Sequence, residues 1–130
     1  MRVVYHSHYI DFFEAARTEA LRAMGLPYRA LEEEGVIMPV VDLAVRYKRP
    51  AYYDDLLEIR TIFTENQPAT RVRIDYEVRR NGDDRVIVTG HVTICFVDAA
   101  RGRPIPAPES VVAAFEAALT HGPELTMPSA

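Results

Sequence analysis

The sequence predicts an α+β protein in which one long helix precedes an antiparallel sheet. Three features indicate this class: an amphipathic helical pattern near the start, four successive segments with strand-like alternation, and a short helical pattern near the end. Because helices and strands are segregated along the chain, the strands should pair antiparallel. Such a sheet can curl around the long helix and bury its apolar stripe. The 130 residues are enough for a single domain, residues 1–130, with its own core.

The first helical pattern covers residues 7–24 and has one apolar face. The positions on this face recur at helical spacing: Tyr9, Phe13, Ala16, Ala20 and Met24, with Phe12 and Ala23 beside them. The opposite face carries Asp11, Thr18 and Arg22. Ser7 is the expected N-cap, whose side chain accepts a backbone N–H, and Gly25 ends the helix. The free backbone N–H groups at the helix start are suited to bind an oxyanion or a polarised carbonyl.

A short helical turn over residues 27–34 follows, and from Val36 onward the apolar spacing becomes alternating. The expected strands cover residues 41–48, 57–63, 71–79 and 85–97, and the first of them should have one buried face. Asn81-Gly82 predicts a tight hairpin turn with positive φ angles, and Gly90 predicts a bend or bulge. A closing helix is expected on Val111, Val112, Phe115 and Leu119, and the tail beyond His121 is expected to fray.

Composition and charge exclude several classes of function. The net charge of −4 argues against nucleic acid as the main partner, because phosphate-backbone binders carry a concentrated positive face. No apolar run approaches the length of a membrane span, and the start lacks the layout of a signal peptide, so a cytoplasmic location is expected. The single cysteine, Cys95, is expected to be a small buried side chain and not a zinc ligand.

Polar and aromatic side chains gather at the start of the first helix: Tyr5, His6, His8 and Tyr9. A histidine there can act as an acid or a base near neutral pH, or it can cap the helix and bond to the backbone. No metal is expected, because no third ligand is visible. The acidic residues close to this end are Asp11 and Glu14. Glu14 either supplies a reactive carboxylate or pairs with Arg17 or Thr18 at helical spacing.

Several segments together resemble one family signature. They are Val3-Val4-Tyr5-His6, Tyr9, Phe13-Glu14-Ala15-Ala16-Arg17 and Gly25-Leu26-Pro27. Farther along, the stretch from Gly35-Val36 to Val41, Arg49-Pro50-Ala51 with Tyr53-Asp54-Asp55 behind it, and Pro106-Ala107-Pro108-Glu109 also fit. The signature is similar to that of the YbgC and 4-hydroxybenzoyl-CoA thioesterase family, and the resemblance covers nearly the whole chain. It implies the hotdog fold, a long central helix wrapped by a curved antiparallel sheet.

The resemblance further implies an acyl-CoA thioesterase that releases a free acid and CoA or a carrier thiol. The backbone N–H at His6 would then polarise the thioester carbonyl, and Glu14 would stand in for the catalytic carboxylate. The expected acyl pocket and substrate contacts are Tyr5, Tyr9, Phe12, Met38, Pro39 and Val40. Lys48, Arg49 and Arg71 would meet the CoA phosphates, unless they simply belong to solvated strand faces. No cofactor is expected, and the protein should form a homodimer or a homotetramer, since a single curled sheet leaves an edge strand open.

The sequence departs from the family pattern before Val3. Family members carry a first strand there and an Asp-Thr-Asp-x-x-Gly motif with the catalytic aspartate, whereas this chain begins Met1-Arg2, with Arg2 where the glycine would stand. Either the natural start lies upstream or the chain is a shortened variant. The alternative functions are a non-catalytic protein that binds acyl thioesters or carrier proteins, and a cone-shaped domain of the ketosteroid isomerase type. The helix signature argues against the second of these.

Overall fold

The structure is a computed structural model, and it describes residues 7–26, 28–52, 54–63, 69–118 and 124–128. The candidate residues Tyr5 and His6 lie outside the described residues, as do Tyr53 and Leu119. In chain order the elements are α1 (His8–Ala23), α2 (Tyr28–Glu33), β1 (Val36–Ile37), β2 (Val40–Tyr47), β3 (Leu56–Phe63), β4 (Arg71–Arg80), β5 (Val86–Cys95), β6 (Val97–Asp98), β7 (Arg103–Pro104), α3 (Glu109–Ala118) and β8 (Glu124–Pro128).

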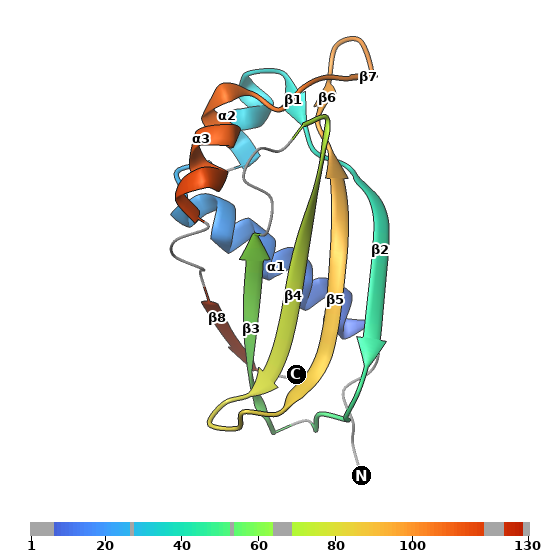
Figure 1. Cartoon of the computed structure of the whole chain (residues 1–130), viewed down its shortest axis with the longest axis vertical. Helices are drawn as coiled ribbons and strands as arrows, with labels where there is room; N and C mark the ends of the chain where they lie inside the picture. The colour runs from blue at the N-terminus through green and yellow to red at the C-terminus, as the bar shows by residue number, and fades with distance from the viewer. Residues whose placement is uncertain (1–6, 27, 53, 64–68, 119–123, 129–130) are drawn as a thin grey trace.

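The architecture is a five-stranded antiparallel sheet with α1 crossing one of its faces (Figure 1). The strand order is β2-β5-β4-β3-β8, and β1, β6 and β7 form a small second sheet at one end. The side chains of β4 alternate between buried and more exposed along the strand, since one face of the sheet packs on α1. This arrangement confirms the predicted α+β class and the hotdog architecture of a long helix wrapped by a sheet.

The core between α1 and the sheet is centred on Phe13, whose ring stacks on Tyr76 with 4.5 Å between centroids. Gly90 makes room for this ring, because a Cβ at residue 90 would lie 2.5 Å from Cε2 of Phe13. The strand register continues through Gly90, so the predicted bulge is absent there. The register shifts instead occur between Val40 and Asp42 and near Val78. Cys95 is buried, as predicted.

The predicted ends of α1 are close to the observed ones, but one cap is absent. Ser7 occupies the N-cap position without a side-chain cap hydrogen bond, and its carbonyl accepts the N–H of Ile10. Gly25 follows the helix with a φ of 78°, in the left-handed region that favours glycine. In the hairpin between β4 and β5, Gly82 has a positive φ and Asn81 does not. None of the helices in the described part of the chain is long and apolar enough to cross a membrane.

Strand β2 lacks the buried face that was predicted for it. It is the edge strand of the sheet, and Val40, Val41, Leu43 and Tyr47 are exposed, while Val45 is half-buried. The physical reason is its position: β2 lies beyond most of the area of sheet that α1 covers (Figure 1). An edge strand with exposed apolar side chains is a surface suited to association.

The prediction of a frayed tail is also wrong, because residues 124–128 form β8 and pair with β3. The pairing is antiparallel and runs from Leu56 opposite Pro128 to Arg60 opposite Glu124. The C-terminal strand therefore forms one edge of the sheet (Figure 1). The other edge, formed by β2, has no neighbouring strand among the described residues.

Candidate active site

The first turn of α1 lies beside the carboxyl end of the open edge strand β2. The ring of Tyr9 meets the ring of Tyr47 edge-on with centroids 5.7 Å apart, and meets the ring of Phe12 at 5.8 Å. Tyr9 and Phe12 are buried, whereas Tyr47 and the neighbouring Ile10 are exposed. The helix start is thus flanked by an aromatic group that reaches from the core to the surface at the sheet edge.

The connection between β2 and β3 passes beside this helix start. Ala51, in the middle of the connection, is fully buried, and its backbone acts on the Tyr9 hydroxyl so as to lower the Tyr9 pKa. Burial raises the pKa of Tyr9, nearby Tyr47 raises it further, and the Ala51 backbone opposes the rise. Tyr9 is therefore held as a neutral phenol whose position depends on the connection.

The connection is in turn held by Arg80, the last residue of β4. The guanidinium donates to Oδ2 of Asp55 at 2.9 Å and to the carbonyl of Pro50 at 2.7 Å. The Asp55 carboxylate also accepts the backbone N–H of Tyr52 at 2.8 Å. That backbone hydrogen bond, with the contribution of Arg80, lowers the pKa of Asp55. Sequence reasoning missed this group, because nothing in the spacing links an aspartate in a connection to an arginine on a later strand.

Glu14, the candidate catalytic carboxylate, is exposed on the second turn of α1. Its backbone carbonyl accepts the Thr18 hydroxyl at 2.9 Å. Arg17, the other expected partner, points into the core and donates to the hydroxyls of Tyr28 at 2.7 Å and Tyr76 at 3.3 Å. The predicted alternative in which Glu14 pairs with Arg17 is therefore wrong, and the Glu14 carboxylate is in no ion pair within the described part of the chain.

The residues predicted to line the acyl pocket fall into two groups. Phe12 and Tyr9 lie at the start of α1, whereas Met38, Pro39 and Val40 lie at the amino end of β2. Val40 is seven residues from Tyr47 along β2, which at roughly 3.3 Å per residue is about 23 Å. Within one protomer the structure does not bring these two groups together.

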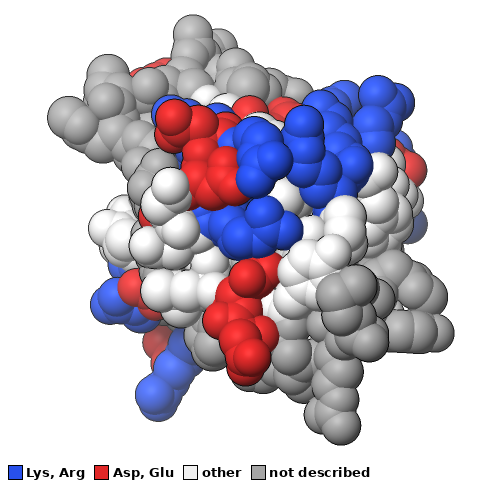
Figure 2. Space-filling view, turned by 90° about the horizontal axis from the view of Figure 1, so that it is seen from below, with Lys and Arg blue, Asp and Glu red and all other residues white. Residues whose placement is uncertain are grey.

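The three candidate phosphate ligands are likewise divided. Lys48 and Arg49 follow β2 directly, and their backbone N–H groups donate to the carbonyl of Ile87 on β5. Arg71 pairs with Cys95, eight residues farther along β5, which is about 26 Å away at the usual rise of a strand. Figure 2, seen from the end of the molecule that holds the β2–β3 connection, shows Lys and Arg side chains gathered on one side of that end.

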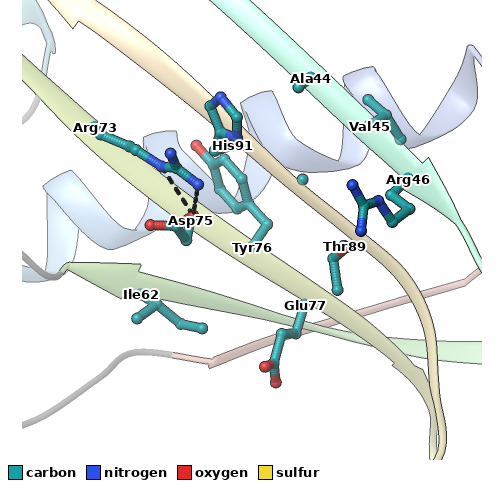
Figure 3. Close-up of a pocket in the computed structure, with 11 residues that line it drawn as sticks. Ala44, Val45, Arg46, Ile62, Arg73, Asp75, Tyr76, Glu77, Thr89 and His91 are labelled. Carbon is teal, nitrogen blue, oxygen red and sulfur yellow. Dashed lines mark hydrogen bonds and ion pairs between the residues drawn. The ribbon is translucent and has the colours of Figure 1, made fainter.

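A separate groove of about 600 Å³ lies on the sheet face opposite α1 (Figure 3). Its walls carry mixed charge: Arg73 and Asp75 form an ion pair at 2.9 Å, and Arg46, Glu77 and His91 lie nearby. The thickness of the sheet separates this groove from the helix start, so it is not the predicted acyl pocket. In the described segments, no three His, Cys, Asp or Glu side chains cluster as metal ligands would.

Together, a long helix wrapped by an antiparallel sheet, with its start beside the edge strand β2, indicates a protein of the hotdog class. The family model of the thioesterase-like superfamily matches residues 1–115. The chain belongs to this superfamily and, within it, to the family of the YbgC acyl-CoA thioesterases.

Individual relatives agree with this assignment. The chain is 36% identical over 114 residues to the acyl-CoA thioester hydrolase YbgC of Escherichia coli, covering 88% of this chain and 84% of the relative. A crystal structure of a hypothetical protein from Thermus thermophilus matches with a TM-score of 0.79 and 31% identity, over 88% of this chain and 85% of that one. A DHNA-CoA thioesterase from Staphylococcus aureus matches with a TM-score of 0.72 and 28% identity, over 80% and 68% of the two chains.

Proposed function

We propose that this protein hydrolyses an acyl-CoA thioester to the free acid and CoA. The observation that carries the proposal is the start of α1, which lies at an open and apolar sheet edge in a chain similar to acyl-CoA thioesterases. A helix start offers backbone N–H groups to the carbonyl oxygen of a thioester, where negative charge develops during attack. The edge beside it offers apolar surface for an acyl group.

The proposed chemistry needs one group to polarise the carbonyl and one to activate water. By family resemblance, the backbone N–H at His6 polarises the thioester oxygen, although His6 lies outside the described residues. Glu14 is the proposed carboxylate, since it is exposed on the second turn of the same helix and is in no ion pair among the described residues. It would take a proton from water as the oxygen attacks the acyl carbon, and the CoA thiolate would leave.

The active unit is proposed to be a homodimer paired through β2. The two edge strands of the sheet are β8, which has five residues, and β2, which has eight and presents exposed Val41 and Leu43. Antiparallel pairing of two β2 strands around a two-fold axis would extend the sheet across both protomers and cover this edge.

Such a dimer would also unite the divided candidate residues. If the two strands overlap over their full length, Val40 of the partner subunit lies opposite Tyr47, beside the start of α1. Tyr9 and Phe12 of one protomer would then form an acyl pocket with Met38, Pro39 and Val40 of the partner subunit. The same pairing carries the partner subunit's Arg71 toward the end that holds Lys48 and Arg49, where the CoA phosphates would bind.

A cytoplasmic location is proposed because CoA thioesters are made and used inside cells. The same site would accept the thioester of a carrier protein, whose pantetheine arm has the same chemistry as that of CoA. Comparing the rates of hydrolysis of acyl-CoA and acyl-carrier substrates shows which of the two thioesters the protein prefers.

The test is steady-state hydrolysis of short, medium and aromatic acyl-CoAs, followed by the appearance of free thiol. Turnover of at least one substrate, with saturation, is the expected result. Tight binding of acyl-CoA by calorimetry without any thiol release would contradict the proposed hydrolysis and indicate a binding protein.

A further inference from the structure

Arg80 is the centre of a contact group that joins three parts of the chain. It lies at the end of β4, donates to Asp55 and to the carbonyl of Pro50 in the β2–β3 connection, and forms an ion pair at 3.6 Å with Asp83 in the β4–β5 turn. Its guanidinium also lies 6.0 Å from the ring centroid of Tyr52. One side chain therefore fixes the connection against the neighbouring turn, and a planar guanidinium suits this task because its donors point in several fixed directions.

This contact group differs from the surface ion pairs of the same strand. The side chains of Arg80 and Asp55 are 23% and 21% exposed, whereas Arg73 in the Arg73–Asp75 pair is 51% exposed. Exposed pairs contribute little because water and salt screen them. Arg80 is better shielded and also satisfies a backbone carbonyl, so its removal leaves more than one polar group without its partner.

The contacts lead from Arg80 to the start of α1. Arg80 holds Pro50 and Asp55, which flank Ala51 on the connection, and Ala51 and Tyr9 are buried in the same core cluster, where the Ala51 backbone acts on the Tyr9 hydroxyl. Tyr9 is the second residue of α1. Both Arg80 and Asp55 also act electrostatically on the Tyr9 hydroxyl. Arg80 is thus linked to the first turn of α1 through the β2–β3 connection.

We propose that Arg80 is a positioning residue for thioester hydrolysis, acting through Asp55, Ala51 and Tyr9 to hold the start of α1 where the thioester carbonyl binds. The proposal rests on the proposed function. A small displacement of groups that bind the carbonyl costs much of the rate, since the hydrogen bonds must match the oxygen in the transition state.

The test compares Arg80→Gln with Arg73→Gln. The second variant is a matched control on the same strand, because it removes an ion pair that lies on the outer face of the sheet. Hydrogen exchange is measured by mass spectrometry on a peptide spanning residues 8–16. Arg80→Gln should speed exchange in this peptide and lower kcat by roughly tenfold to hundredfold, with a smaller change in KM. Arg73→Gln should do neither. Arg80→Lys should recover part of kcat, because an ammonium group can still reach one of the two acceptors.

A second comparison separates positioning through Tyr9 from general destabilisation. In a Tyr9→Phe background the interaction of Ala51 with the hydroxyl is already lost, so Arg80→Gln should lower kcat by a smaller factor than in the wild type. Equal factors in both backgrounds would overturn the proposed route, and so would unchanged exchange over residues 8–16 or an unchanged kcat. If the wild type hydrolyses no acyl-CoA, the proposed function fails, and the exchange data still decide whether Arg80 orders the helix start.

Discussion

At the scale of single residues, Glu14 is the side chain on which the proposed chemistry depends most directly. Replacing it by glutamine keeps its size and helix-forming tendency but removes the carboxylate. We expect Glu14→Gln to lower kcat by about 100-fold or more, with a small change in KM, because a general base typically contributes that much. Steady-state kinetics with the best acyl-CoA substrate measures this.

The control for this variant is Glu19→Gln on the same helix. Glu19 forms an ion pair with Arg22 on the surface, so its loss should change kcat by less than about twofold. If Glu14→Gln is as active as this control, another group activates the water.

Gly90 is the residue where packing, not conformation, requires glycine. A Cβ at this position would lie 2.5 Å from Cε2 of Phe13 and 2.8 Å from the carbonyl oxygen of Ala44. The backbone atom cannot move aside easily, so Gly90→Ala should lower the free energy of unfolding by about 1–3 kcal/mol. Urea denaturation measures the loss, and Thr89→Ala on the outer face of the same strand should stay within about 0.5 kcal/mol of the wild type.

At the scale of elements, β8 has a defined role at the edge of β3. A variant that ends at residue 123 leaves the outer backbone groups of β3 without a partner strand. Its free energy of unfolding should fall by roughly 0.5–1.5 kcal/mol for each backbone hydrogen bond lost, and the uncovered edge should promote self-association. Thermal melts and sedimentation velocity report both effects.

The matched control for the β8 deletion ends at residue 128 and keeps the whole strand. It should behave like the full chain. Equal stability of the two shortened chains would show that β8 contributes nothing to the sheet.

Elements with a strong local pattern were predictable from sequence, and those defined by distant partners were not. The alternation in β4 and the stripe of α1 predict their buried faces because each packs against the protein's own core. Strand β2 has the same alternation, yet most of its apolar residues are exposed, since the pattern does not say which surface covers them. Strand β8 was missed because its pairing with β3 depends on a segment far away in the chain.

The candidate site follows the same division. The start of α1 was predictable because the apolar face of the helix is a local pattern. The Asp55–Arg80 pair joins residues 25 positions apart, and its role depends on the path of the connection, which spacing does not reveal. Arg17 sits on the buried side of α1 because two tyrosine hydroxyls receive its guanidinium, and only the folded chain brings them together.

At the scale of the whole molecule, the proposed dimer makes a prediction about backbone groups of β2. The backbone N–H of Lys48 donates to the carbonyl of Ile87 on β5. From there the pairing of β2 with β5 continues without a shift to Asp42, which lies opposite Thr93. Because antiparallel strands alternate in the direction of their hydrogen bonds, Lys48 and every second residue before it face β5, and Leu43 faces the open edge. Proline at residue 43 therefore removes an N–H that only a partner strand would use.

We expect Leu43→Pro to be a folded monomer with little hydrolytic activity, since each proposed acyl pocket takes residues from both protomers. Leu43→Val, which keeps the N–H and an apolar β-branched side chain, should remain a dimer with nearly full activity. Light scattering coupled to size-exclusion chromatography gives the mass, and circular dichroism checks that the proline variant is folded. A Leu43→Pro protein that stays dimeric and active would place the dimer interface elsewhere on the molecule, and an acyl pocket shared across β2 would then be wrong.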